Sequence, residues 1–287
     1  MRVMMIALGL AVVLIAGIGL ARRNAVHWSS ASSLAKAKNE PLEITPSEGK
    51  RSPVIVELFT SEGCSSCPPA DVVLMQLETS QPVAGAEVIA LGEHVDYWNY
   101  IGWSDPFSSE AFSARQQAYA PVFNNDGVYT PQIVVDGQAE LIGSNSSKAQ
   151  AAIARAAKLP KAEVTIVAVQ AASAKDAQAI KLKVSVEKLP AISSGDVAEV
   201  LLAITESNVS SQVARGENSG RRLGHTAVVR ELRSLGQIAG ANKPFMAETT
   251  AMPGKDWKRG DLRAVVFVQE RAHKRILGAA AIPLTNE

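Results

Sequence analysis

The chain is poor in the residues and motifs that mark the commonest enzyme classes. It has two cysteines and four histidines among 287 residues. It carries no Walker-type phosphate loop, no dinucleotide fingerprint and no zinc-finger spacing. Neither sign of charge prevails, since 29 lysines and arginines face 28 aspartates and glutamates, so no overall field attracts nucleic acid or an anionic substrate. We therefore expect no nucleic-acid partner, no resident metal and no cofactor.

Charge is also missing from residues 3–20, a mainly apolar run between Arg2 and Arg22. The run reaches the roughly 18 residues of a membrane-spanning helix and ends in small residues that suit signal cleavage. Residues 1–23 are thus expected to be a signal peptide or a membrane anchor, and an uncleaved segment would make the membrane a partner. Either alternative predicts an exported protein, in the bacterial periplasm or anchored facing outside the cytoplasm. Residues 24–52, without sustained periodicity, are expected to be a flexible linker.

Strand and helix patterns alternate over residues 53–159. Continuous β-prone runs predict strands, apolar positions at helical spacing predict helices, and Asp136-Gly137 predicts a hairpin turn. The expected elements are a strand at 54–59, a helix at 68–80, a strand at 86–91, a helix opened by Asp105-Pro106, strands at 128–135 and 139–142, and a helix at 144–159. This βαβαββα order predicts an α/β domain whose first two strands run parallel.

From residue 160 the pattern changes to alternating strands with no long helix. The expected strands are at 164–169, 180–186, 197–205, 225–235, 262–268 and 276–282. Short strands at this spacing predict an all-β antiparallel sandwich of the immunoglobulin-like type over residues 160–287. The sequence assigns no role to this second domain and does not predict the oligomeric state.

The two cysteines, Cys64 and Cys67, lie three residues apart between the first strand and the helix that Pro68 opens. At such a place the free N–H groups and dipole of the helix stabilise a thiolate, and the first thiol is expected to be exposed. A static disulfide would close a loop of only four residues and would stabilise the chain little. The pattern therefore favours a reversible dithiol/disulfide pair over a structural staple.

The segments around this pair resemble a known fold. A strand, a Cys-x-x-Cys motif on a helix and Thr130-Pro131 before a hairpin strand resemble the thioredoxin fold, over residues 54–159. The run ELFTSEGCSSCPPAD at 57–71, with VDYW at 95–98 and YTPQ at 129–132, closely resembles an uncharacterised family of exported thioredoxin-like proteins, a domain of unknown function. The likeness continues through RGENSGR at 215–221.

The resemblance implies roles for five residues. Cys64 would be the nucleophile that attacks a disulfide, and Cys67 would resolve the mixed disulfide. Pro131 would follow a cis peptide bond, and the backbone of Thr130 would pair with an extended substrate. Glu57 would be a buried acid that takes the proton of Cys67, although one extra residue separates it from the motif. The implied partners are the thiols and disulfides of proteins or peptides.

A substrate groove is expected beside the cysteines. The carboxyl ends of parallel strands meet at one edge of a sheet, which brings His94, Asp96, Tyr97 and Trp98 toward Cys64. Aromatic side chains that cluster in this way also commonly belong to a core, so both interpretations stay open.

The function that this pattern predicts is thiol-disulfide exchange by an exported protein, in a direction that the sequence does not reveal. One alternative is a copper-handling protein of the same fold, in which Cys64, Cys67 and His94 would bind the metal. Another is a redox-inactive adaptor that presents surfaces to a partner in the cell envelope.

Overall fold

The computed structural model describes residues 51–169, 179–238, 240 and 244–284. The expected signal peptide or anchor at 1–23 lies outside these residues, as does nearly all of the expected linker at 24–52. Ser52, which the linker was expected to include, is the first residue of a strand. Among the described residues, no helix is both long and apolar enough to cross a membrane.

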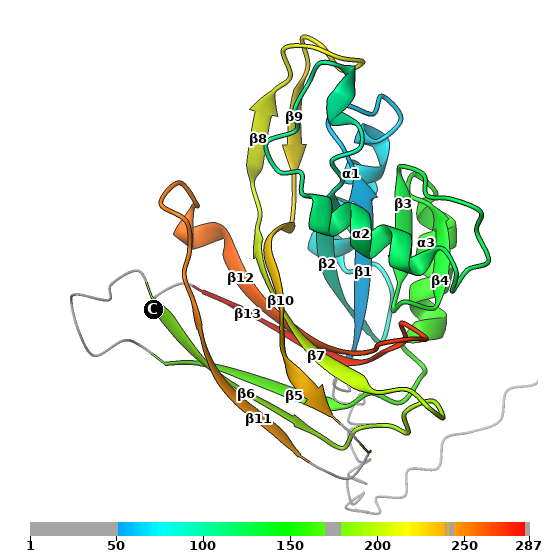
Figure 1. Cartoon of the computed structure of the whole chain (residues 1–287), viewed down its shortest axis with the longest axis vertical. Helices are drawn as coiled ribbons and strands as arrows, with labels where there is room; N and C mark the ends of the chain where they lie inside the picture. The colour runs from blue at the N-terminus through cyan, green and yellow to red at the C-terminus, as the bar shows by residue number, and fades with distance from the viewer. Residues whose placement is uncertain (1–50, 170–178, 239, 241–243, 285–287) are drawn as a thin grey trace, which may run out of the picture. The chain divides into compact units, whose positions relative to one another are not determined.

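One mixed sheet of eight strands organises most of the described chain (Figure 1). In spatial order its strands are β13 (Ile276–Pro283), β12 (Leu262–Glu270), β7 (Ala198–Glu206), β10 (Val228–Ile238), β2 (Ala86–His94), β1 (Ser52–Thr60), β3 (Gln132–Val135) and β4 (Ala139–Ile142). The helices are α1 (Pro68–Ser80), α2 (Glu110–Tyr119), α3 (Ser146–Ala156) and the short η1 (Asn99–Ile101) and η3 (Arg259–Asp261). A second sheet holds β11 (Phe245–Ala251), β6 (Ile180–Glu187) and β5 (Glu163–Val169), and a separate hairpin holds β8 (Val209–Gln212) and β9 (Arg222–His225).

Strand β1 is apolar on both faces, as its sequence predicts for a buried central strand. Val56 and Leu58 pack in the core beneath α1 and α3, whereas Ile55 and Phe59 point to the other face, on which α2 lies. β1 runs parallel to β2 and antiparallel to β3. The predicted helix at 68–80 and the predicted strands at 86–91 and 139–142 are present as α1, β2 and β4.

Helix α2 begins later than the sequence predicts. The hydroxyl of Ser109 accepts a hydrogen bond from the Ala111 N–H and caps the helix. Asp105, which was expected to open this helix, lies outside it, and its carboxylate bonds other segments. The proline at 106 therefore marks the loop before the helix and not its first turn.

The large sheet crosses the expected boundary between residues 53–159 and 160–287. Strand β10 joins β2 through the pair Val228 and Gly92, and the Gly92 N–H donates to Ala227 O at 2.8 Å. A Cβ at position 92 would lie 3.1 Å from Thr226 O, so the missing side chain permits this approach. Pairing between strands so distant in sequence leaves no local signal, and the predicted boundary missed it.

The C-terminal half still forms two packed layers. The sheet β11-β6-β5 lies against one face of β7 and β12, and side chains such as Leu182, Leu202 and Val266 fill the space between them. One layer of the expected sandwich is therefore present as a separate sheet. The other layer is the continuation of the large sheet and is not an independent domain. Strands β8, β9 and β11 were not predicted as they stand.

A second contact joins the two halves at the Asp136-Gly137 turn, the hairpin turn that the sequence predicts. Both residues have positive φ, 49° and 67°. The Ile276 N–H donates to Asp136 O, and Lys161 forms an ion pair with the Asp136 carboxylate at 2.5 Å. A Cβ at position 137 would lie 1.8 Å from the carbonyl oxygen of Lys274. The turn thus packs directly on the backbone between β12 and β13.

This packing predicts that Gly137→Ala destabilises the whole unit. The matched control is Gly85→Ala, because Gly85 also has positive φ (77°) but nothing lies within 4 Å of its missing Cβ. The control should cost about 1 kcal/mol of unfolding free energy, from backbone strain alone. Gly137→Ala should cost about 3 kcal/mol or more, because backbone must also move. Denaturant unfolding of both variants checks this, and equal losses would contradict the contact.

Candidate functional site

Cys64 and Cys67 form a disulfide, with their Cα atoms 5.4 Å apart. The pair follows β1, and Cys67 is the N-cap residue of α1, with its carbonyl accepting from the N–H groups of Ala70 and Asp71. Both cysteines have 0% exposed surface. The expectation that the first thiol is exposed is therefore wrong for this state. A segment far along the chain binds the backbone of the same turn.

That segment is the cover loop, residues 213–221, which connects β8 to β9. The side-chain amide of Asn218 donates to Cys64 O and to Glu62 O, both at 2.9 Å. The carboxylate of Glu217 accepts from the Ser65 N–H at 2.9 Å. The loop thus binds the backbone of the cysteine turn directly, and hairpin β8–β9 lies beside the start of α1 (Figure 1).

Glu62, two residues before Cys64, is a fully buried carboxylate. It accepts from the indole N–H of Trp103 at 2.8 Å and from the hydroxyl of Ser211, and it contacts His225 Nε2 at 3.1 Å. Its own N–H donates to Asp105 Oδ2 at 2.8 Å. Burying a carboxylate is costly unless such partners satisfy it, so Glu62 holds these segments together.

His225, at the end of β9, lies between two carboxylates. Its Nδ1 is 3.8 Å from Asp71 Oδ2, too long for a hydrogen bond, and its Nε2 is in contact with Glu62. Burial alone would lower the pKa of His225, but Asp71 and Glu62 raise it to about 10. At neutral pH the imidazole is therefore a cation that offsets the charge of its acidic neighbours.

This charge predicts a pH-dependent effect of His225→Gln on stability. A pKa raised on folding stabilises the folded state fully below the unfolded pKa, about 6.5, and the gain is lost as pH rises toward the folded pKa. The variant should thus lose about 2 kcal/mol more at pH 6 than at pH 10. Unfolding curves at both pH values measure this, with His273→Gln, at an exposed histidine, as the control. A loss that is independent of pH would contradict the assignment.

His94 lies behind this group and does not line an open groove. It is 1% exposed, and its Nδ1 is 2.7 Å from Asp105 Oδ2. Its ring packs edge-on against that of His225, with centroids 4.7 Å apart. Burial would raise the pKa of Asp105, but His94 and the N–H groups of Glu62 and Phe107 hold it below its ordinary value. The structure brings His94 to the cysteine end of the sheet as a buried partner of Asp105.

The three other expected groove residues are half-buried. Trp98 packs against the residue before Cys64, since a Cβ on Gly63 would lie 3.1 Å from Trp98 Cβ. Asp96 accepts from the hydroxyl of Ser113 on α2. The Tyr97 hydroxyl donates to Gln116 at 3.0 Å, and burial raises the pKa of Tyr97 to about 12. Trp98 is the one that borders the cysteine turn.

Thr130 and Pro131 meet the same region, and the peptide bond between them is cis. The Trp98 indole N–H donates to the Thr130 hydroxyl at 2.8 Å. Gly143 packs between Pro131 and α1, because a Cβ there would lie 3.0 Å from Pro131 Cβ and 2.9 Å from Ala70 Cβ. The chain thus brings Thr130 and Pro131 to the first turn of α1.

Glu57 is placed elsewhere, on the α2 face of the sheet. Its carboxylate forms an ion pair with Arg115 at 2.6 Å and accepts from the Tyr119 hydroxyl at 2.5 Å. Glu93, also fully buried, lies 3.3 Å from Arg115, and burial raises its pKa well above the ordinary value. These contacts give no support to Glu57 as the proton acceptor of Cys67.

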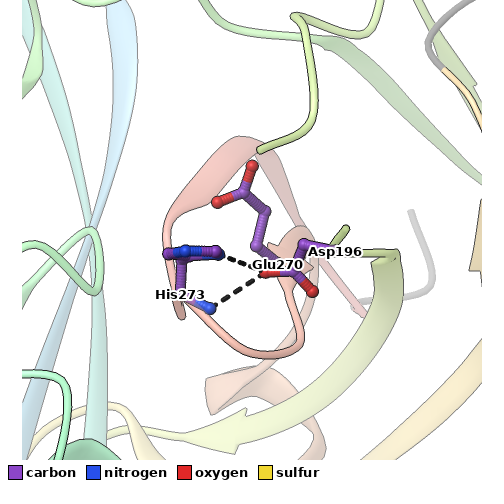
Figure 2. A group of neighbouring side chains, drawn as sticks. All are labelled: Asp196, Glu270 and His273. Atoms are coloured by element: carbon purple, nitrogen blue, oxygen red, sulfur yellow. Dashed lines mark hydrogen bonds and ion pairs between the residues drawn. The ribbon is translucent and has the colours of Figure 1, made fainter. Parts of the chain in front are cut away.

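A different group of metal-ligating side chains comes within 4.8 Å of one another in the described part of the chain, namely Asp196, Glu270 and His273. Figure 2 shows that both bonds between these residues join His273 to Asp196. Asp196 also accepts from the N–H groups of Val197 and Ala272, and Glu270 accepts from Ser193 and Arg275. The carboxylate oxygens of Asp196 and Glu270 are therefore already occupied by hydrogen bonds to protein groups. Cys64, Cys67 and His94 do not form such a group among the described residues, which gives the copper alternative no support.

Sequence reasoning missed the residues that surround the disulfide. Glu62 and Asp71 lie inside the quoted cysteine signature but received no role, and Asn218 lies inside the quoted run at 215–221. His225 had no signal of its own. The sequence offered one hint that these segments meet, because the runs at 57–71 and 215–221 both belong to the same family resemblance.

Comparisons with known proteins agree with this description. A family model described as "Protein of unknown function (DUF1223)" matches residues 55–269. The chain is similar to the crystal structure of protein AGR_C_4864 from Agrobacterium tumefaciens, with 23% identity and a TM-score of 0.63 over 83% of this chain and 97% of that one. It is also similar to HBP35 of Porphyromonas gingivalis, with 15% identity and a TM-score of 0.54 over 82% and 76%. At these identities the likeness shows the fold alone, and no curated protein matches.

Proposed function

Since the chain belongs to the DUF1223 family of proteins of unknown function, its own residues carry the argument, and we propose that it is an exported thioredoxin-like protein that exchanges thiols and disulfides. The reacting pair is Cys64 and Cys67, and the partners are thiols and disulfides of proteins or peptides. The single observation that carries the proposal is the Cys64–Cys67 disulfide at the N-cap of α1, directly after strand β1.

Three features support this proposal. The order β1-α1-β2-α2-β3-β4-α3 matches the βαβαββα order of a thioredoxin-like domain. Cys67 is the N-cap residue of α1, and the positive end of the helix dipole favours a thiolate there. The disulfide closes a four-residue turn, which stabilises a fold little and suits reversible chemistry better.

The exchange follows from these positions. A substrate thiolate attacks Cys64 Sγ, the bond to Cys67 breaks, and Cys67 leaves as a thiolate. A second substrate thiolate then attacks the mixed disulfide, which releases an oxidised substrate and leaves Cys64 as a thiolate. The protein has gained two electrons and takes up two protons. The reverse sequence starts from the Cys64 thiolate, with Cys67 resolving the intermediate.

The redox-inactive adaptor is the second candidate, and one observation favours it. Both sulfur atoms are completely buried in the disulfide state, as they would be in a static crosslink. An adaptor would bind its partner equally well after Cys64 is blocked, whereas an oxidoreductase would lose its exchange with that partner.

A glutathione redox titration of the chain tests the proposal. The disulfide should open and re-form reversibly, with a change of two hydrogens in intact mass, because a helix-capping thiolate is a good leaving group. Cys67→Ala should accumulate a mixed disulfide at Cys64, since the resolving thiol is missing. Cys64→Ala, the matched single-cysteine variant, should accumulate far less. A disulfide that stays closed across the whole titration would sink the oxidoreductase proposal.

A further inference from the structure

The cover loop binds the cysteine turn through polar groups that resemble a peptide backbone. The loop contacts two backbone groups of the turn, the Ser65 N–H and the Cys64 carbonyl, which also accepts from the Cys67 N–H at 3.2 Å. The Ser65 N–H donates to a carboxylate oxygen of Glu217, and the side-chain amide of Asn218 donates to the Cys64 carbonyl, each at 2.9 Å. An extended polypeptide offers the same pair of groups, a carbonyl oxygen and an amide N–H.

The two contacts differ in how easily water replaces them. Asn218 is fully buried, and its side-chain oxygen accepts from Arg221 at 2.7 Å. Glu217 is exposed, so water competes for its bond with the Ser65 N–H. Gly216 lies over η1 and the residues after it, since a Cβ there would be 3.6 Å from Ile101 and 3.4 Å from Trp103. The Glu217 end of the loop is thus the weaker one.

The loop and its hairpin form a unit of their own. The loop closes on itself, because the Val213 N–H donates to Arg221 O at 2.9 Å and the Gly220 N–H donates to Val213 O at 2.8 Å. Strands β8 and β9 pair with each other and belong to no larger sheet in the described structure. A two-stranded hairpin is marginally stable alone and depends on side contacts such as those of Ser211 and His225 with Glu62. Displacement of the loop would therefore break no strand pairing of either large sheet.

From these contacts we propose that the cover loop is an autoinhibitory segment that occupies the position of an extended polypeptide substrate on the cysteine turn. The inference rests on the proposed function and names its substrate class, a cysteine-containing polypeptide in extended form. The substrate's carbonyl replaces Glu217 at the Ser65 N–H, and its amide replaces Asn218 at the Cys64 carbonyl. Displacement of the loop exposes Cys64 at the moment when a polypeptide is in place.

The test measures how fast Cys64 reacts in the full chain when Cys67→Ala leaves it as the single thiol. One probe is an unfolded peptide whose cysteine carries a nitrothiobenzoate group, and the other is the small reagent dithiobis(nitrobenzoate). In each case the Cys64 thiolate attacks the probe's disulfide, a new S–S bond forms, and nitrothiobenzoate leaves as a coloured thiolate. The variants to compare are Glu217→Ala, Asn218→Ala and the control Glu248→Ala. The control removes an exposed carboxylate of β11 that is paired with Lys183 of β6.

Glu217→Ala should raise the rate with the peptide about threefold, because it loses one hydrogen bond to the segment around Cys64. Asn218→Ala should raise it about tenfold or more, because it loses two bonds to that segment and one to Arg221. The gain should be larger for the peptide than for the small reagent, because the peptide also needs the freed backbone groups. Glu217 is exposed, so its variant keeps the fold even where Asn218→Ala does not. Equal rates for Glu217→Ala and Glu248→Ala would overturn the autoinhibitory role, and equal gains with both probes would overturn the substrate assignment.

This outcome is separate from that of the glutathione titration. The reaction of a single thiol reports only how accessible Cys64 is, whereas the titration reports whether the pair cycles. A reversible disulfide with unchanged accessibility in Glu217→Ala would leave the oxidoreductase standing and remove the inhibitory loop. A faster Cys64 in Glu217→Ala would support the loop's role as a cover even where the titration fails.

Discussion

The buried carboxylate of Glu62 is the interaction on which the arrangement around the disulfide depends. A charged group with no exposed surface must find its hydrogen bonds inside the protein. Glu62 finds them on the loop after η1, through Trp103, on β8, through Ser211, and on β9, through His225. Three segments that are distant in the sequence are thereby drawn to the residue two places before Cys64.

One consequence is that residues from the C-terminal half of the chain form part of the surroundings of the disulfide. Glu62 contacts the β8–β9 hairpin, the hairpin carries the cover loop, and Asn218 of the loop donates to the Cys64 carbonyl. The protonated imidazole of His225 lies between Glu62 and Asp71, and its positive charge offsets the electrostatic cost of burying these carboxylates. Sequence reasoning treated the two halves separately and expected an exposed Cys64.

Features that depend on neighbouring residues could be predicted from the sequence, whereas contacts between distant segments could not. Helix α1, strands β1 and β2 and the turn at Asp136-Gly137 follow from local patterns, and each was predicted within a few residues. The pair Val228 and Gly92 joins strands more than 130 positions apart and leaves no periodicity to detect. The same holds for Asn218 and His225, whose roles arise only when their hairpin reaches the cysteine turn. The cysteine pair was recognised from its spacing and its place between a strand and a helix, and Pro131 was found because the family likeness carried it.

Glu57 shows where a stricter use of local pattern would have corrected the prediction. Side chains alternate along a strand, so Val56 and Leu58, which lie beneath α1, place Glu57 on the opposite face. The helix that carries Cys67 at its cap covers the Val56 face, whereas Glu57 pairs with Arg115 of α2. Thr60 returns to the α1 side, and its hydroxyl donates to Asp71. The acid on the α1 side of the sheet is therefore Asp71, in the first turn of the helix that Cys67 caps, whereas Glu57 belongs to the α2 side.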